Sequence, residues 1–570
     1  MNIMEQYNLF LKNTTNYTYL QNELIQIKDD INAINDRFWK DLEFGTGGLR
    51  GEIGAGINRM NIFTVGKATQ GLADYLNENF EDPSVAIAYD TRNFSSEFAN
   101  HARDVFVSNG IKVYYFDGVR PTPMLSYAVR YTKASAGIVI TASHNPKEYN
   151  GYKVYGSDGG QITDEAAKDI TNRIKEIELF RGVKTSQNSS EIADSVDISK
   201  SVDKAYYEKV AELTIRKELV KEYASDISIL YSPLHGSGNI PVRHMLNKLG
   251  FSNVDVVKEQ ELPDGNFSTT PYPNPEEPAV YKLAIDKASK TNPDLIFATD
   301  PDCDRIGVLV KDNYGTFSVL TGNQVGALLC DYIIQGHIEA NTMPENPAII
   351  KTIVTSDMGK VICNNNNISV FETLTGFKYI GELVGMWQQD HKHNFLLGFE
   401  ESYGYLAGDF VRDKDAVIAS ILIAEMALWY KKQNMSLFDA MENLYKKYGY
   451  FKEKLISVTM KGQEGSQKIS GIMNSLRTNY GKVFENTGLL QVEDYLSSQY
   501  KNLNSNEIGK LILPKSNVLK FIFDDESWIV FRPSGTEPKI KIYVAARGID
   551  HPDNDNRFLE LEGIAQKILE

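Results

Sequence analysis

The chain has 570 residues, 42% of them hydrophobic, which is too long for one hydrophobic core, so we expect about three to five domains. The formal net charge is -15 at pH 7, and such an acidic surface disfavours nucleic acid and anionic membranes as partners. The three cysteines provide no disulfide framework, the first residues show no secretory signal, and no uncharged apolar run reaches the roughly 18 residues of a membrane span, so we expect a cytoplasmic protein.

Strand-like and helix-like segments alternate along the chain, which is typical of an α/β fold. Helical spacing of apolar residues is visible, for example, at 323–338 and 415–432. Because ligands bind at the carboxyl ends of strands in open α/β sheets, polar loops that follow strands are the expected places for chemistry. Such runs of β-branched or aromatic residues ending in polar loops lie at 85–91, 137–145, 227–238, 295–305, 395–402 and 528–536.

Two changes of pattern mark domain boundaries. The segment 185–200 is polar and low in aromatic residues, which predicts a connection between a first and a second domain. Around 445–451 a helical pattern gives way to strand-like runs, which predicts the start of a last domain.

The first chemically informative loop is Thr141-Ala142-Ser143-His144-Asn145-Pro146, after a short apolar run. A serine at the end of a strand, with an imidazole beside it and Lys153 nearby, suits a serine that carries a phosphoryl group. The alternative is a polar turn whose Ser and Asn cap a helix. A Ser-His-Asp hydrolase is disfavoured, because no G-x-S-x-G elbow surrounds Ser143 and His144, its chain neighbour, is not expected to turn and take its proton.

The second informative loop contains three aspartates at alternate positions between two strand-like runs: Asp300, Asp302 and Asp304. Their mutual repulsion is relieved only around a cation or in open solvent, where they would form a solvated acidic turn. Oxygen ligands favour Mg²⁺ or Ca²⁺ over zinc. An EF-hand is a poor fit, because Arg305 and Lys311 stand where that loop needs Gly and Glu. The few ligands predict Mg²⁺ with open positions that can also hold a phosphate.

Two later segments offer groups for a phosphorylated ligand. The segment 532–541 combines an arginine, hydroxyls and a glycine, which predicts a phosphate-binding nest; the alternative is an ordinary turn with a helix cap at Ser534. Glu400 and Glu401 are adjacent acids, but neighbouring carboxylates after a strand point in different directions, which argues against a glycosidase pair.

These motifs resemble those of the α-D-phosphohexomutase superfamily. The T-A-S-H-N-P and D-x-D-x-D-R loops are joined, in the family's order, by the Phe-Gly-Thr-Gly-Gly-Leu-Arg-Gly, Gly-Phe-Glu-Glu-Ser and Arg-Pro-Ser-Gly-Thr-Glu-Pro segments at 44–51, 398–402 and 532–538. The resemblance runs from about Phe44 to Lys541, nearly the whole chain.

The resemblance implies four domains around a central cleft, with three similar mixed α/β domains and a smaller α+β C-terminal domain. We expect residues 1–205 to carry the phosphoserine, 206–320 the metal-binding loop, 321–450 the sugar-binding loop and 451–570 the C-terminal phosphate-binding loop.

The resemblance also implies that phosphorylated Ser143 and the three aspartates hold Mg²⁺. Arg305 either steadies the phosphoryl group or the sugar, or forms a salt bridge within the acidic loop. The substrate-binding residues implied in this way are Arg305, Thr375, Gly376, Lys378, Glu400, Ser402, Arg532, Ser534, Gly535, Thr536 and Lys539.

Proton transfer is expected to involve Arg50, His144 and Lys153, which resemble family positions near the phosphoserine; nearby cations are expected to lower the pKa of Lys153. The phosphomannomutase/phosphoglucomutase branch follows its Glu-x-Ser with Gly-His, whereas this chain has Tyr403-Gly404-Tyr405. The R-x-K-D pattern at 412–415 makes Lys414 the substitute; the alternative is a surface lysine paired with a neighbouring aspartate.

The resemblance is greatest to the branch of bacterial α-phosphoglucomutases and eukaryotic phosphopentomutases. It implies interconversion of α-D-glucose 1-phosphate and glucose 6-phosphate, with Mg²⁺ as cofactor and glucose 1,6-bisphosphate as intermediate and activator. The alternatives are a phosphopentomutase acting on ribose or deoxyribose 1-phosphate, a glucose-1,6-bisphosphate synthase, and a non-catalytic sugar-phosphate sensor, which has no need of the intact serine and aspartates. A small phosphosugar is the expected partner, with no nucleic acid or membrane, and the oligomeric state does not follow from the sequence.

Overall fold

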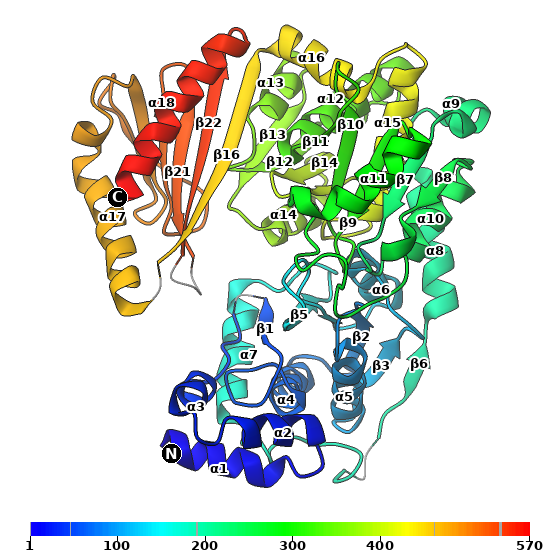
Figure 1. Cartoon of the computed structure of the whole chain (residues 1–570), viewed down its shortest axis with the longest axis vertical. Helices are drawn as coiled ribbons and strands as arrows, with labels where there is room; N and C mark the ends of the chain where they lie inside the picture. The colour runs from blue at the N-terminus through cyan, green and yellow to red at the C-terminus, as the bar shows by residue number, and fades with distance from the viewer. Residues whose placement is uncertain (1, 46, 190–191, 461, 535–538, 570) are drawn as a thin grey trace. The chain divides into compact units, whose positions relative to one another are not determined.

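The computed structural model describes residues 2–45, 47–189, 192–460, 462–534 and 539–569. The chain forms two compact units, and the predicted alternation of strands and helices is confirmed (Figure 1). The boundary between the units falls within strand β14, Asn394–Glu400. The first unit contains residues 1–321, 377–398 and 402–436, and the second contains 322–376, 399–401 and 437–570.

The first sheet is mixed, with strand order β1-β5-β4-β2-β3-β6. Strands β2, β3, β4 and β6 are parallel, whereas β5 pairs antiparallel with β4 and β1. Strand β6 lies within the predicted connection at 185–200 and adds a parallel edge strand beside β3, which the sequence did not predict. The elements are β1 Gly48–Glu52, α4 Ile62–Asn79, β2 Ser84–Tyr89, α5 Ser95–Val107, β3 Lys112–Tyr115, α6 Thr122–Thr132, β4 Ala136–Ile140, β5 Tyr149–Gly156, α7 Asp164–Glu176 and β6 Ser195–Asp197.

The second sheet has the order β11-β10-β9-β7-β8, with β10 antiparallel to both of its neighbours. The β9–β10 turn carries the three aspartates. The elements are α8 Ser199–Glu212, α9 Lys217–Tyr223, β7 Ile229–Ser232, α10 Asn239–Lys248, β8 Val254–Val256, α11 Lys282–Thr291, β9 Leu295–Thr299, β10 Ile306–Lys311, β11 Phe317–Leu320 and α15 Ala416–Lys431, with short 3-10 turns at Ala224–Asp226, Lys258–Gln260 and Pro278–Tyr281.

The third sheet has the order β13-β12-β14-β15, and β12 and β13 are parallel. The apolar helical pattern at 323–338 is confirmed as α12. The elements are α12 Gly322–Ala340, β12 Pro347–Thr352, α13 Met358–Asn365, β13 Ser369–Thr373, α14 Phe377–Asp390, β14 Asn394–Glu400, β15 Gly404–Leu406 and α16 Leu437–Tyr448.

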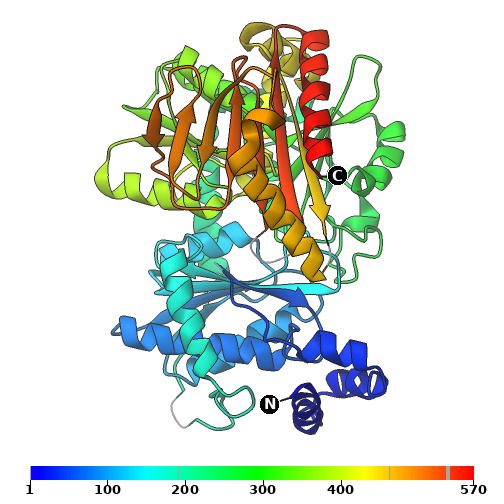
Figure 2. The ribbon, with the colours of Figure 1, turned by 90° about the vertical axis from the view of Figure 1, so that its left-hand side faces the viewer.

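The last sheet is antiparallel and has seven strands in the order β16-β22-β21-β20-β17-β18-β19. Helices α17 and α18 pack on one face of it over a core that includes Met473, Phe521 and Leu561 (Figure 2). The predicted change of pattern near 445–451 is confirmed, because α16 ends at Tyr448. The elements are β16 Tyr450–Thr459, α17 Gly462–Val483, β17 Leu489–Asp494, β18 Gln499–Asn502, β19 Ile508–Lys510, β20 Leu519–Phe523, β21 Trp528–Pro533, β22 Lys539–Gly548 and α18 His551–Leu569.

Three helices precede the first sheet and form a small hydrophobic core together with Ala55, Phe63 and Phe180: α1 Ile3–Asn13, α2 Thr18–Gln26 and α3 Ile31–Phe38. Asn2 and Glu5 start α1 with a capping box. Phe10 is 1% exposed and contacts Phe38, Phe63 and Phe180 edge to face. None of the described helices combines the length and apolar character that a bilayer span requires.

Candidate active site

Ser143 lies in a tight turn between β4 and β5 and is 4% exposed. Its φ of 53° falls in the left-handed region, and its backbone N–H donates to Thr141 Oγ1 at 2.8 Å. The turn leads directly into β5, so the alternative in which this segment caps a helix is wrong.

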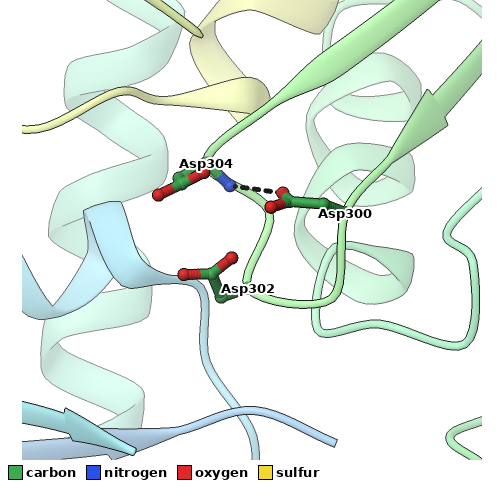
Figure 3. Close-up of side chains that lie close together, drawn as sticks. All are labelled: Asp300, Asp302 and Asp304. Carbon is green, nitrogen blue, oxygen red and sulfur yellow. Dashed lines mark hydrogen bonds between the residues drawn. The ribbon is translucent and has the colours of Figure 1, made fainter. Parts of the chain in front are cut away.

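The aspartates of the β9–β10 turn are gathered and buried (Figure 3). Asp300 and Asp302 are 0% exposed and Asp304 is 1% exposed, so the solvated acidic turn is excluded. One ligand oxygen from each carboxylate lies within 4.8 Å of the others. Burial, together with the two neighbouring carboxylates, raises the pKa of Asp300 well above its usual range.

This cluster has the properties of a cation site. Among the residues that the structure describes, Asp302 Oδ1 and Asp304 Oδ1 are buried and have no hydrogen-bond partner. A buried carboxylate oxygen without a partner is costly, and coordination by a metal ion removes that cost. The donors are all oxygen, which suits Mg²⁺. Cys303, between two of them, is a packed and fully buried side chain, as expected.

The Ser143 turn touches this cluster directly. Ser143 Oγ donates to Asp300 Oδ2 at 2.8 Å, and His144 Nδ1 lies 3.1 Å from the same Oγ. The expectation that His144 cannot turn back to Ser143 is therefore wrong. Burial, Arg305 and Arg50 lower the pKa of His144 well below its usual range, which makes its imidazole a weak base and keeps a hydrolase mechanism disfavoured.

Two lysines reach the same carboxylates. Lys153 Nζ lies 2.8 Å from Asp302 Oδ2 and 3.5 Å from Asp304 Oδ2. Burial favours the neutral amine, but the two aspartates outweigh it and raise the pKa of Lys153. The expected lowering of that pKa by nearby cations is therefore wrong, because carboxylates are the nearer charges. The same contact lowers the pKa of Asp302 despite its burial.

Lys414 lies 3.1 Å from Asp304 Oδ2 and 2.9 Å from Asp413 Oδ1. Its side chain is 12% exposed, so the alternative of a surface lysine with only a neighbouring aspartate as partner is wrong. The aliphatic stem lies over Gly404: a Cβ at that position would come within 2.2 Å of Lys414 Cδ. Lys414 is thus held against the aspartate cluster because position 404 has no side chain.

Several supporting residues are not apparent from the sequence. Thr122, at the start of α6, donates from Oγ1 to Asp302 Oδ2 at 2.7 Å, and its N–H donates to the Asp302 carbonyl. Tyr155 donates to Asp413 Oδ2 at 2.7 Å. The Pro-Thr-Pro pattern at 121–123 indicates a helix start, but no local signal identifies these distant partners.

The two arginines near the turn have different partners. Arg305 Nη1 lies 2.5 Å from Glu276 Oε1, whereas its Nε is 3.9 Å from Asp304 Oδ1. Of the two alternatives for Arg305, a salt bridge within the acidic loop is therefore not the shorter contact: the ion pair with Glu276, outside the loop, is shorter. Arg50, on β1, lies 3.5 Å from Asn145 Oδ1 in the Ser143 turn.

In the second unit, Glu400 Oε1 accepts a hydrogen bond from the Gly376 N–H at 3.0 Å, which brings two predicted sugar-binding residues together. Glu401 Oε2 instead accepts from Thr355 Oγ1 at 3.1 Å, so the adjacent carboxylates have different partners, as expected. The ring of Phe399, next to Glu400, packs directly on Gly326, because a Cβ at position 326 would lie 2.2 Å from that ring.

The remaining predicted sugar-binding residues lie in different places. Thr375 Oγ1, in the second unit, is buried without a hydrogen-bond partner among the described residues. Lys378 and Ser402 belong to the first unit, where Lys378 Nζ lies 2.6 Å from Asp164 Oδ1.

The predicted phosphate nest lies at the β21–β22 turn. Arg532 is opposite Lys541 in this strand pair, and the Ser534 N–H donates to the Lys539 carbonyl at 2.7 Å. Burial, Glu401 and Glu400 raise the pKa of Tyr543, whereas Arg532 lowers it, so the arginine and both glutamates lie close to one buried phenol. Gly535 and Thr536 lie outside the described residues.

Three sequence models of one protein family match the chain in order. They are the α/β/α domains I, II and III of phosphoglucomutase/phosphomannomutase, at residues 41–181, 204–315 and 321–448. The chain belongs to the phosphoglucomutase/phosphomannomutase family. The expected membership and the three α/β domains followed by a β-rich C-terminal domain are thereby confirmed. The four boundaries given above stay a prediction.

Relatives of this family cover nearly all of the chain. A phosphoglucomutase of Staphylococcus haemolyticus is 38% identical over 512 residues, which are 89% of this chain and 91% of that protein. A phosphoglucomutase of Staphylococcus aureus is 40% identical over 517 residues, 90% of this chain and 91% of that protein.

Solved structures of the family have a similar fold. Parafusin from Paramecium, in its open form, matches with a TM-score of 0.67 at 19% identity, over 92% of this chain and 95% of that one. A phosphoglucomutase/phosphomannomutase family protein from Burkholderia thailandensis matches with a TM-score of 0.66 at 16% identity, over 92% and 96% of the two chains.

Proposed function

We propose that this chain is an α-phosphoglucomutase, which interconverts α-D-glucose 1-phosphate and glucose 6-phosphate through phosphorylated Ser143 and a glucose 1,6-bisphosphate intermediate. The observation that carries the proposal is the 2.8 Å hydrogen bond from Ser143 Oγ to Asp300 within a buried cluster of three carboxylates. Curated relatives of about this length that are named phosphoglucomutase support the choice of reaction.

The phosphoryl group would pass from Ser143 Oγ to the free hydroxyl of the bound sugar phosphate, and the other phosphoryl group of the resulting bisphosphate would return to Ser143. Asp300, Asp302 and Asp304, with an oxygen of phosphorylated Ser143, would hold Mg²⁺, which when bound supplies positive charge to neutralise the phosphoryl oxygens. Added glucose 1,6-bisphosphate would act as activator by phosphorylating Ser143.

The residues around Ser143 suit proton transfer. Lys153 and Lys414 lie within 3.5 Å of Asp304 Oδ2 and would exchange protons with the sugar hydroxyl or with Ser143 Oγ. Arg50 and the neutral His144 would orient the phosphoryl group, and Arg305, paired with Glu276, would steady it.

The substrate would be bound at its hydroxyls and at its second phosphate. Glu400, which accepts from the Gly376 N–H, and the Thr375 hydroxyl, which has no hydrogen-bond partner within the described part of the chain, suit sugar hydroxyls, with Ser402 and Lys378 as further contacts. The second phosphate would be bound by Arg532, Ser534, Gly535, Thr536 and Lys539. A cytoplasmic location is part of the proposal.

The test combines phosphate mapping with steady-state rates. Peptide mapping of the purified protein should place phosphate on Ser143, and Ser143→Ala should abolish mutase activity, whereas the matched change at exposed Ser186 should not. Phosphate found only on other residues of the active protein would refute the carrier role. Faster turnover of ribose 1-phosphate than of glucose 1-phosphate would favour a phosphopentomutase, and net bisphosphate formation from another phosphoryl donor would favour a synthase.

A further inference from the structure

The turn that carries Ser143 has a backbone conformation that is unfavourable for a residue with a side chain. Ser143 has φ 53°, and left-handed conformations of this kind persist only where the surroundings hold them. The hydrogen bond from the Ser143 N–H to Thr141 Oγ1 holds one side of the turn. The carbonyl side needs a separate support.

Arg92 provides that support. Its side chain is fully buried, and its guanidinium donates to the carbonyl oxygens of Ser143 and Asn145, of Pro146 at 2.8 Å and of Tyr149 at 3.1 Å. Three carbonyl groups of the turn and that of Tyr149, the first residue of β5, therefore converge on a single planar group. An arginine has enough fixed donors for such a cluster, whereas a lysine ammonium has three.

Asp90 contacts both Arg92 and Thr141, the two residues that support the turn. One of its carboxylate oxygens, Oδ2, lies 3.3 Å from Arg92 Nε and accepts from Thr141 Oγ1 at 2.6 Å. The other, Oδ1, accepts from Ser95 Oγ at 2.7 Å. Asp90 directly follows β2, which pairs in parallel with β4, so the end of one strand fixes the turn that follows its neighbour.

An aromatic ring also packs against the guanidinium of Arg92. The ring of Phe267, which is 1% exposed, stacks on Arg92 with its centroid 4.9 Å from Cζ. Among the described residues, the contacts of Arg92 with Ser143 are made to its carbonyl and not to Oγ. Arg92 thus acts on the shape of the turn and does not touch the phosphoryl-carrying atom.

We propose that Arg92 and Asp90 are positioning residues for phosphoryl transfer: together they hold the Ser143 turn in its left-handed conformation and so fix where the phosphorylated Oγ lies against the aspartate cluster. This inference rests on the proposed function. Because a misplacement of about 1 Å can cost roughly a hundredfold in rate, their effect should fall on kcat rather than on substrate affinity.

The experiment compares Arg92→Met, Arg92→Lys and Thr141→Val in the full-length chain. For Arg92→Met we expect kcat with glucose 1-phosphate to fall about a hundredfold and KM to change less than about twofold. The ³¹P NMR signal of phosphorylated Ser143 should shift toward that of free phosphoserine. Arg92→Lys should recover part of both effects, and Thr141→Val should shift kcat and the signal in the same direction.

The matched control is Arg59→Met, because Arg59 is a buried arginine that pairs with Asp36 and Glu52. It should lose stability while keeping kcat and the ³¹P signal. The inference would be overturned if Arg92→Met, like this control, kept both kcat and the ³¹P signal. If Arg92→Met does not fold, an unchanged kcat and ³¹P signal in Thr141→Val would overturn it instead. A wild-type protein without phosphate on Ser143 and without mutase activity would instead refute the proposed function.

Discussion

At the scale of single residues, the balance of charge around Ser143 favours a bound cation. The buried aspartates of the β9–β10 turn carry up to three negative charges, and Lys153 and Lys414 offset two. Phosphorylation of Ser143 would add nearly two more negative charges. Arg305, 3.9 Å from Asp304, and the buried Arg92 offset part of this charge, and a bound cation would offset more of it.

Replacement of Asp302 by asparagine should therefore act through the metal. The amide keeps the shape but removes charge, so we expect the apparent affinity for Mg²⁺ to fall by at least the roughly tenfold to hundredfold that is typical of losing a partner of a metal ligand, with a large loss of activity at low Mg²⁺. Activity measured over a Mg²⁺ titration checks this, with exposed Asp286→Asn as control. Full activity of the wild type in excess chelator would contradict the assignment.

Lys414 should matter for turnover more than for binding. Lys414→Met removes a proton donor or acceptor close to Asp304, so we expect kcat to fall by about 10²–10⁴-fold with a smaller change in KM. The control in steady-state kinetics is Lys432→Met, which also removes a lysine from an ion pair. Its partner, Asp226, is remote from Asp304 in the sequence. Near-normal kcat would return the role to Lys153 or His144.

At the scale of elements, the strands and their carboxyl-terminal loops were predictable, because short β-branched runs ending in polar residues have a local signal. The T-A-S-H-N-P loop and the aspartate turn were correctly expected to lie at strand ends. The supports of these loops were not predictable. The order of the first sheet brings Asp90 and Arg92 to the Ser143 turn, and Thr122 reaches Asp302, 180 residues away, in the turn of another sheet. The edge strand β6 was missed because its short polar sequence lacks strand periodicity.

Strand β16 contains a carboxyl group that should make stability depend on pH. Glu453 Oε1 is buried without a hydrogen-bond partner among the described residues, and burial raises the pKa of Glu453 to about 7, although Ser356 and Asn323 oppose the rise. A raised folded pKa means that the neutral form is favoured in the folded state. Stability from this group is then present at low pH and is lost as pH rises from about 4.5 to about 7.

Glu453→Gln should remove this dependence. Relative to wild type, we expect little change at pH 4 and a gain of up to about 3 kcal/mol at pH 8, measured by urea unfolding. Exposed Glu485→Gln is the control. A variant that loses stability at both pH values would show that the carboxylate is better accommodated than its burial suggests.

At the scale of the whole molecule, the first 40 residues stand apart from the matched family domains, which begin at residue 41. Helices α1–α3 nevertheless share a core with Phe63 on α4 and with Phe180. These helices were not predicted from the sequence, because the segment before Phe44 carries none of the motifs that mark the strand ends and precedes the matched domains.

Phe10→Ala should test what these helices contribute. Loss of a buried phenylalanine typically costs about 3–5 kcal/mol, so we expect a marked fall in melting temperature with kcat per folded molecule unchanged. Trp39→Ala, at a residue that is 59% exposed, should have little effect. A loss of kcat without a loss of stability would mean that the helices act on catalysis.

The stem of Lys414 over Gly404 has a consequence for how this site can change over evolution. The Gly-His pattern given above for the phosphomannomutase/phosphoglucomutase branch implies a histidine at position 404, whereas here the stem of Lys414 lies over Gly404. A histidine at 404 and the Lys414 stem cannot occupy the same volume. Gly404→His alone should therefore displace Lys414, and Lys414→Met alone should remove the lysine while position 404 supplies no histidine in its place. We therefore expect the effects of substitutions at positions 404 and 414 to depend on each other, and a double-mutant cycle should show strong positive epistasis between them.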